Sequence, residues 1–188
     1  MNPEPLLRAF TALRSALYSC GFIFLWAWLA VTVRPFDTRI PWSTPEWLRP
    51  LGFVLAGLGG LLALSCIVVF TFRGRGTPAP FDAPRVFVAT GPYRFVRNPM
   101  YLGAAGVLAG AGLAVRSPAI LFLTLGFLLL MHGFATLYEE PTLRARFGDS
   151  YAQYTRTVRR WIPGIPRGGK KRGRPASTRE TPPSWPPP

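Results

Sequence analysis

Four long apolar runs, separated by short polar segments, constrain this chain more than any other feature. Residues 15–33 and 51–72 are each long enough to cross about 30 Å of hydrocarbon as a helix. Residues 118–138 form a third such run, and residues 100–115 form a shorter run rich in glycine and alanine. The sequence therefore predicts an all-α integral membrane protein with about four transmembrane helices.

The composition supports a membrane protein with basic flanks. The net charge is +14, yet 49% of the residues are hydrophobic and the mean hydropathy is +0.21. A nucleic-acid-binding protein would carry the charge without the apolar runs. The first run is long for a signal peptide and lacks a small-x-small cleavage site, so we expect a retained helix. Cys20 and Cys66 both lie in apolar runs and are predicted to be small buried hydrophobic residues, with no disulfide framework and no metal site.

The arginine and lysine residues predict the orientation in the membrane. If the four runs all cross the membrane, 18 of these 22 residues lie on one side of it, in the N-terminal segment, the loop at 73–98 and the segment after residue 138. The positive-inside rule places both termini and this loop in the cytoplasm. Four tryptophans would then form an aromatic belt at the opposite surface. They are Trp26, Trp28, Trp42 and Trp47. Without an evident organelle signal, the sequence favours a bacterial cytoplasmic membrane.

A change of composition at residue 163 divides the chain. Residues 1–162 are predicted to form the membrane domain, and residues 163–188 form a basic tail rich in proline and glycine that is expected to be disordered. The tail sequence "KKRGRP" resembles an AT-hook core, which binds the minor groove. In a membrane protein, however, a basic tail favours an anionic leaflet. We therefore expect the lipid bilayer, and no nucleic acid, as a partner.

Residues 139–163 ("EEPTLRARFGDSYAQYTRTVRRWIP") predict a further helix after the last apolar run. Gly148 favours a break, and Asp149 or Ser150 would cap the helical segment after it. Apolar side chains then recur at helical spacing: they are Tyr151, Tyr154, Val158 and Trp161. This pattern is typical of a helix in the cytoplasmic membrane interface, or of an aromatic stripe that packs on the membrane domain. Both interpretations place the helix beside the 73–98 loop.

The segment "GPYRFVRNPMYLG" (91–103) predicts the start of a membrane helix. Asn98 is a favourable capping residue, and Pro99 suits the first helical position, so we expect a helix over 99–115. Its positive dipole end, supported by Arg94 and Arg97, favours an anionic group. The Gly106-x-x-x-Gly110 spacing predicts close packing against a neighbouring helix.

A second polar cluster lies at the end of the 118–138 run. His132, Thr136, Glu139 and Glu140 share one helix face by spacing. The carboxylates are either solvated anchors or functional groups, and His132 either acts at the site or hydrogen-bonds a neighbouring helix. Together with the cationic helix start, these residues suit a ligand that carries both a carboxylate and a cation.

The combination "TGPYRFVRNPMYLG", an apolar helix and "YEEPTLRARFGDSYAQYTRTVRRWIP" resembles the integral-membrane methyltransferases of the isoprenylcysteine carboxyl methyltransferase and phospholipid N-methyltransferase superfamily. The resemblance covers residues 85–163. It implies methyl transfer from S-adenosylmethionine, bound at the cytoplasmic face, to a lipidic acceptor that enters from the bilayer.

The resemblance also implies site residues. The cofactor would be bound by Arg85, Val86, Phe87, Val88, Tyr93, Asn98, Pro99, Tyr101 and Glu139. Glu139 would bind the cationic amino group of the cofactor. Glu140 and His132 are the candidate catalytic residues, because an amine acceptor must lose a proton and these side chains, with Tyr93, lie nearby in the sequence.

Two departures from the family pattern bear on activity. Asn98 stands where the family most often has histidine, and Ala135 stands where the prenylcysteine enzymes have arginine, which argues against a prenylcysteine acceptor. The methyl acceptor could still be an amine, a thiol or another lipid nucleophile. The alternative function is a non-catalytic membrane protein that retains the scaffold. A sterol-reductase-like relative with a nicotinamide cofactor would be a larger protein than this one.

Overall fold

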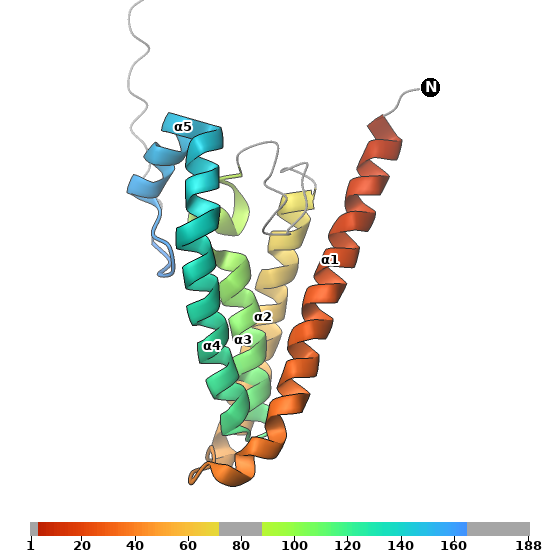
Figure 1. Cartoon of the computed structure of the whole chain (residues 1–188), viewed down its shortest axis with the longest axis vertical. Coiled ribbons are helices and arrows are strands. Elements are labelled where there is room, and N and C mark those ends of the chain that lie inside the picture. Colours follow the sequence, from red (N-terminus) through yellow and green to blue (C-terminus); the bar gives the residue numbers. More distant parts are fainter. Residues whose placement is uncertain (1–3, 72–87, 165–188) are drawn as a thin grey trace, which may run out of the picture.

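The computed structural model describes residues 4–71 and 88–164. Every regular element in these ranges is helical, and Figure 1 shows the main helices running side by side along the long axis, except for the last, which lies at one end of the bundle. The main helices are α1 (Glu4–Val33), α2 (Arg49–Val69), α3 (Pro99–Ala114), α4 (Pro118–Phe134) and α5 (Glu140–Thr157). Shorter turns are η1 (Arg34–Arg39), η2 (Glu46–Leu48), η4 (Gly91–Arg94) and the π-helical η5 (Ala135–Glu139). The all-α prediction is confirmed.

Three stretches of the described helices are long and apolar enough to cross a membrane. They are Leu13–Arg39, Glu46–Val69 and Pro118–Thr157. Helix α3 has 16 residues, which corresponds to about 24 Å at 1.5 Å per residue and is shorter than the hydrocarbon layer. It nevertheless lies alongside the longer helices, between α2 and α4 (Figure 1).

Glycines allow α2 and α3 to pack backbone against backbone. A Cβ atom on Gly59 would lie only 2.6 Å from the carbonyl oxygen of Gly103, and one on Gly103 would lie 2.7 Å from the amide nitrogen of Ala63. A Cβ on Gly110 would collide with the amide nitrogen of Ala56. The predicted packing role of Gly110 is confirmed, and its partner is α2.

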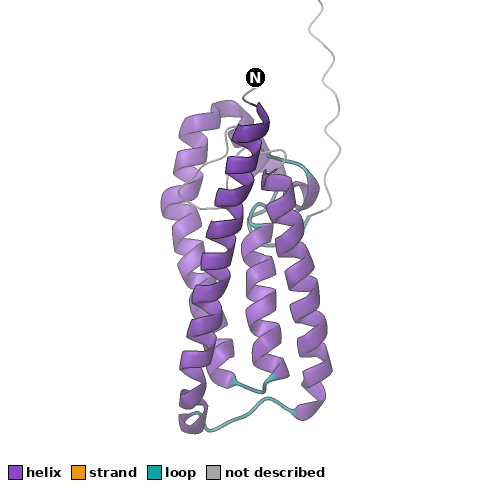
Figure 2. Ribbon diagram, turned by 90° about the vertical axis from the view of Figure 1, so that its right-hand side faces the viewer, coloured by secondary structure: helices purple, strands orange, loops and turns teal. Residues whose placement is uncertain are grey.

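The connections at the end of the bundle opposite the N-terminus, drawn as loops in Figure 2, are tied together by polar contacts. The Ala119 amide, in the first turn of α4, donates to Asp37 in η1 at 2.8 Å. Arg116 donates through Nε to the carbonyl oxygen of Thr44 at 3.0 Å. Helix α4 begins after Ser117, whose hydroxyl accepts from the Ile120 amide, with proline at the first helical position.

The core lies where α1 packs against α3 and α4. Phe127 of α4 is fully buried, and its ring meets Trp26 of α1 edge to face with centroids 4.7 Å apart. Trp26, which the sequence analysis placed in the aromatic belt, is half-buried, and its ring packs in this cluster. The side chains of Trp28, Trp42 and Trp47 are exposed.

Three further expectations need correction. Cys66 is fully buried, but Cys20 is exposed on the outside of α1, where lipid rather than protein would cover it. Asn98 precedes α3 as predicted, but its side chain makes no capping hydrogen bond. Helix α5 ends at Thr157 because Val158 has extended backbone angles (φ −113°, ψ 127°), so Trp161 is not on that helix.

The predicted break at Gly148 is confirmed. Gly148 has φ 50° and ψ −125° inside α5, a backbone conformation that side chains disfavour. After this kink, the Tyr151 side chain is 3% exposed, and the Tyr154 hydroxyl donates to the Tyr93 carbonyl oxygen at 2.6 Å. Of the two interpretations of the aromatic stripe, packing on the membrane domain is confirmed for these tyrosines.

Candidate functional site

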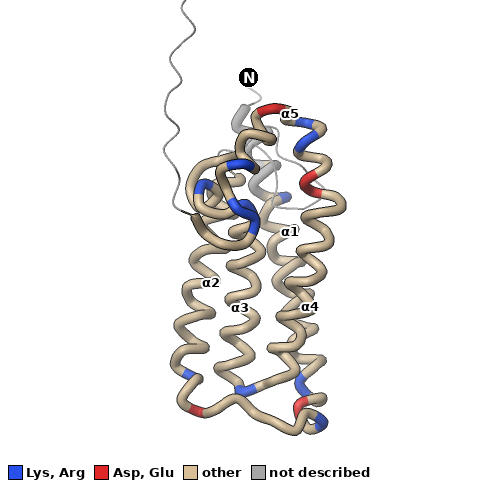
Figure 3. The backbone as a smooth tube through the Cα atoms, turned by 90° about the vertical axis from the view of Figure 1, so that its left-hand side faces the viewer, with Lys and Arg blue, Asp and Glu red and all other residues tan. Residues whose placement is uncertain are grey.

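The candidate site lies at the end of the bundle where α3 begins and α4 passes through η5 into α5. Charged residues gather towards the two ends of the bundle (Figure 3). At this end, Arg97 and Arg160 form ion pairs with Glu140, which follows Glu139 in the sequence. A segment that we name the strap, residues 158–164, follows α5 and returns across the start of α3. Three elements distant in sequence therefore meet at this end.

Backbone hydrogen bonds fix the strap against the segment that precedes α3. The amides of Arg97 and Asn98 donate to the carbonyl oxygens of Arg159 and Arg160, at 2.9 and 3.3 Å. The Gly164 amide donates to the Phe95 carbonyl oxygen at 2.9 Å. The strap thus holds the entry to α3 through main-chain contacts, whose formation does not depend on side-chain identity.

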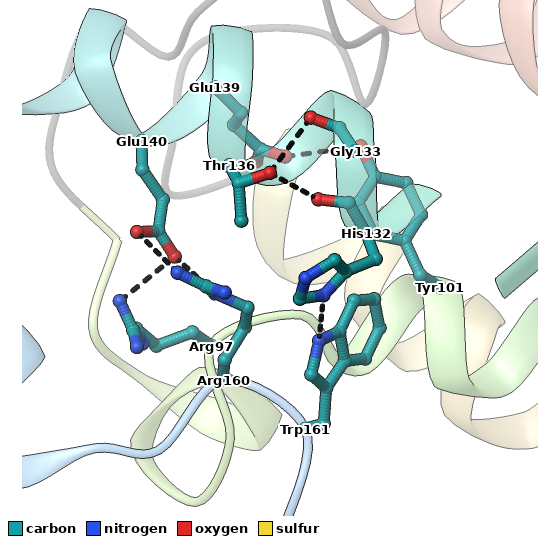
Figure 4. A network of polar contacts seen from close by, with 9 residues as sticks. All are labelled: Arg97, Tyr101, His132, Gly133, Thr136, Glu139, Glu140, Arg160 and Trp161. Carbon is teal, nitrogen blue, oxygen red and sulfur yellow. Dashed lines mark hydrogen bonds and ion pairs between the residues drawn. The ribbon is translucent and has the colours of Figure 1, made fainter. Parts of the chain in front are cut away.

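Glu140 is held by two arginines (Figure 4). Arg160 donates from Nε and Nη2 to the two carboxylate oxygens, at 2.7 and 3.0 Å, and Arg97 donates from Nη1 at 2.9 Å. The three side chains are only 14–26% exposed. The two guanidinium groups hold this carboxylate in one orientation through charge-assisted hydrogen bonds, so the arrangement orders the site.

Glu139 has a different partner from its neighbour in the sequence. Its Oε2 accepts a hydrogen bond from the hydroxyl of Tyr101, on the first turn of α3, at 3.1 Å. Tyr101 is 6% exposed, while Glu139 is half-buried. The two carboxylates predicted as a pair are therefore divided: Glu140 faces the strap, and Glu139 faces α3. The π-helical turn η5 ends at Glu139, and such turns are frequent at functional sites.

Two buried donors at the start of α3 have no partner among the described residues. They are Nδ2 of Asn98 and Nε of Arg97. Asn98 is 8% exposed, and leaving such donors without an acceptor is energetically costly. Both lie beside the positive end of the α3 dipole, so this position favours an anionic oxygen.

Tyr93 lies in a second buried cluster with Cys66 and Val88. Burial raises the pKa of Tyr93 well above its usual value, and the nearby Cys66 and Glu139 act in the same direction. The phenol therefore stays protonated near neutral pH and does not serve as a base. Arg85, Val86 and Phe87 lie outside the described residues.

His132, in the last turn of α4, hydrogen-bonds the strap. Nε1 of Trp161 donates to Nδ1 of His132 at 3.0 Å, and the two rings are tilted by 32°. The expected hydrogen bond of His132 is thus present, but its partner is in the strap and not on a neighbouring helix. The Trp161 ring lies 6.5 Å from the ring of Tyr101.

The structure brings together most of the described residues that the sequence singled out. Tyr101 and Glu139 join α3 to η5, and Asn98 and Pro99 lie at the start of α3. Tyr93 and Val88 lie together in the second buried cluster. Sequence reasoning missed the contacts of Arg160 and Trp161, because helical spacing placed both on the continuation of α5. One available signal was Pro163, since the residue before a proline disfavours helix.

Two comparisons bear on this geometry. A family model described as phospholipid methyltransferase matches residues 47–150, which is more than half of the chain. The match includes α2, α3, α4 and most of α5, and it excludes α1 and the strap. No curated protein matches the chain.

Proposed function

Since the chain belongs to the phospholipid methyltransferase family, we propose that it transfers a methyl group from S-adenosylmethionine to a phospholipid acceptor at the membrane surface. The observation that carries the proposal is the junction of α3 with η5, where Glu139 and the unpartnered donors of Arg97 and Asn98 lie at the same end of the bundle. S-adenosylmethionine, when bound, supplies a methyl group activated by a sulfonium centre.

Glu139 is the residue that would bind the cationic amino group of the cofactor. Its carboxylate is half-buried and held by Tyr101, so it is oriented before any ligand binds. Of the two glutamates, Glu140 already has two cationic partners. Charge complementarity therefore favours Glu139 for this role.

The donors at the start of α3 would bind the carboxylate of the cofactor. Nδ2 of Asn98 and Nε of Arg97 are buried and unpartnered, and a carboxylate offers the acceptors that they lack. Asn98 replaces the histidine most often found at this position in the family, and an amide retains a hydrogen-bond donor there. Val88, Tyr93, Pro99 and Tyr101 would line the same pocket.

The main contribution of the protein would be positioning. Holding the reacting groups in a productive arrangement supplies up to roughly 7–11 kcal/mol, and no strong base is needed where the acceptor arrives unprotonated. Catalysis by Glu140 or His132 stays a prediction. The ion pairs of Glu140 favour a positioning role for it instead.

We extend the proposal to the membrane topology. Helix α3 would complete a set of four crossing helices, with α5 and the strap at the cytoplasmic interface of a bacterial membrane. Residues 1–162 would form one domain. The lipid acceptor would reach the site from the bilayer, which agrees with the apolar outer surfaces of α1 and α4.

The test is binding of S-adenosylmethionine to the purified protein in lipid nanodiscs, measured by calorimetry. We expect the wild type to bind and Glu139→Gln to bind about tenfold more weakly or worse, because a charge-assisted contact is lost. The glutamine amide oxygen still accepts from Tyr101, so the fold should persist.

Glu46→Gln is the matched control, since Glu46 lies at the opposite end of the bundle with its side chain 73% exposed. It should bind like the wild type. A folded wild type that does not bind the cofactor at millimolar concentration would contradict the proposal and favour a non-catalytic scaffold.

A further inference from the structure

His132 is the only histidine of the chain, and its contact with Trp161 determines where its proton lies. An indole Nε1–H only donates hydrogen bonds, so Nδ1 of His132 must present a lone pair to it. A neutral imidazole carries one ring proton, which in this arrangement is on Nε2. His132 therefore has a donor at Nε2 and no free lone pair to accept a proton.

The contact does not depend on a ligand, because the strap fixes Trp161 on both sides. The Arg160 carbonyl oxygen accepts from the Asn98 amide before Trp161, and the Gly164 amide donates to Phe95 after it. Arg160 itself is bound by both oxygens of Glu140. Figure 4 shows the hydrogen bond between the indole of Trp161 and the imidazole of His132.

The histidine also lies next to the candidate site. The ring of Trp161 is 6.1 Å from that of His132 and 6.5 Å from that of Tyr101, whose hydroxyl binds Glu139. The side chain of His132 is exposed on the last turn of the apolar helix α4, where the surroundings would be the polar region of a membrane under the proposed topology. A hydrogen-bond donor at this place would meet the phosphate and ester oxygens of lipids.

We propose that Trp161 is a positioning residue that holds His132 with Nε2 protonated, and that this Nε2–H binds an oxygen of the phospholipid acceptor. The inference deepens the proposed function and rests on it for the identity of the acceptor. It assigns His132 to substrate binding and not to proton removal. Trp161 lies beyond the residues matched by the family model.

The first experiment reads the protonated nitrogen directly. Protein labelled with 15N-histidine, in a maltoside detergent, gives one pair of ring-nitrogen NMR signals because His132 is the only histidine. We expect Nε2 to carry the proton in the wild type and in the control Trp47→Phe, whose exposed indole lies at the other end of the bundle. In Trp161→Phe the proton should be shared between the two nitrogens. A wild type protonated at Nδ1 would overturn the inference.

The second experiment tests lipid binding with the same label. Phosphatidylethanolamine added to the micelles should shift the Nε2 signal saturably. An ether-linked phosphatidylethanolamine, which keeps the phosphate but lacks ester carbonyls, separates the two oxygen sources. A shift with both lipids assigns the phosphate, and a shift with the diester alone assigns the carbonyl. No saturable shift with either lipid would overturn the binding role.

The third experiment uses methyl transfer to phosphatidylethanolamine. In His132→Gln the amide nitrogen reaches the position of Nε2, so it keeps a donor but cannot remove a proton. We expect its KM for the lipid to stay within about threefold of the wild type, and that of His132→Ala to rise about tenfold, with cofactor binding unchanged in both. Loss of kcat in His132→Gln would identify a base and contradict the inference.

These outcomes separate the inference from the proposed function. A wild type that fails to bind S-adenosylmethionine would remove the proposed function, and the two NMR experiments would still decide the protonation of His132 and its contact with lipid. Normal methyl transfer by a wild type whose His132 is protonated at Nδ1 would support the proposed function and overturn the inference.

Discussion

At the scale of single residues, Glu139 and Glu140 show how adjacent and identical side chains acquire different roles. Glu140 binds Arg97 and Arg160, while Glu139 binds Tyr101. The sequence predicted the importance of both carboxylates, because paired acids interrupt a basic membrane surface. The sequence did not predict that the two carboxylates have different partners. These partners lie on or before α3 and in the strap, and the spacing of residues within one helix does not predict contacts with distant segments.

The Glu140 cluster leads to a prediction about stability. Arg160→Ala leaves a carboxylate that is 14% exposed with one fewer partner, which costs about 1–3 kcal/mol. For a chain of this size, the midpoint of thermal denaturation in detergent should fall by about 2–12 °C. Arg159→Ala is the control, because it removes an equal charge from an exposed side chain. Equal midpoints in the two variants would show that the ion pair contributes nothing measurable.

At the scale of helices, the close packing of α2 on α3 was the part most accessible from the sequence. Glycine spacing predicted that Gly110 faces another helix, because a missing side chain lets backbones approach. The sequence could not identify α2 as the partner, nor separate Gly59, which contacts α3, from Gly57, which has open space around it. That difference depends on the rotation of α2 about its axis.

Alanine substitutions should distinguish packed glycines from open ones. In Gly110→Ala the new methyl group meets the backbone of Gly52 and Ala56, so we expect a loss of about 1–3 kcal/mol from overpacking. Gly126→Ala places its methyl group where nothing lies within 4 Å, and the helix propensity of alanine should leave stability unchanged or slightly raised. Denaturation of both variants in the same detergent checks this. A tolerated Gly110→Ala would mean that α2 and α3 are further apart in solution.

The strap is the element that the sequence did not predict. Periodicity extended α5 to Trp161, whereas the helix ends at Thr157 and the chain turns back to pair with residues 95–98. Backbone hydrogen bonds between distant segments leave no periodic pattern in the side chains. The contact of Trp161 with His132 could not be predicted either, because it also joins segments that are distant in the sequence.

At the scale of the whole molecule, the arrangement of the helices, taken with the distribution of charge, predicts which end of the bundle faces the cytoplasm. The N-terminal end of α1, the start of α3, α5 and the strap all lie at one end of the bundle, and η1, η2 and the connection from α3 to α4 lie at the other (Figure 1). The end with the candidate site is also the end that the positive-inside rule places in the cytoplasm. The site would then open to the compartment where soluble cofactors are made.

Single cysteines at the two ends test this orientation. In a chain carrying Cys20→Ala and Cys66→Ala, Glu46→Cys and Arg159→Cys each introduce one thiol at an exposed position. In spheroplasts, whose cytoplasmic membrane is still sealed, a membrane-impermeant maleimide should label Glu46→Cys directly. Arg159→Cys should react only after the membrane is opened, because its thiol would face the cytoplasm. Labelling of both thiols in detergent shows that each is reactive. The reverse pattern in sealed cells would place the candidate site outside the cytoplasm, and a soluble cytoplasmic methyl donor could not then reach it.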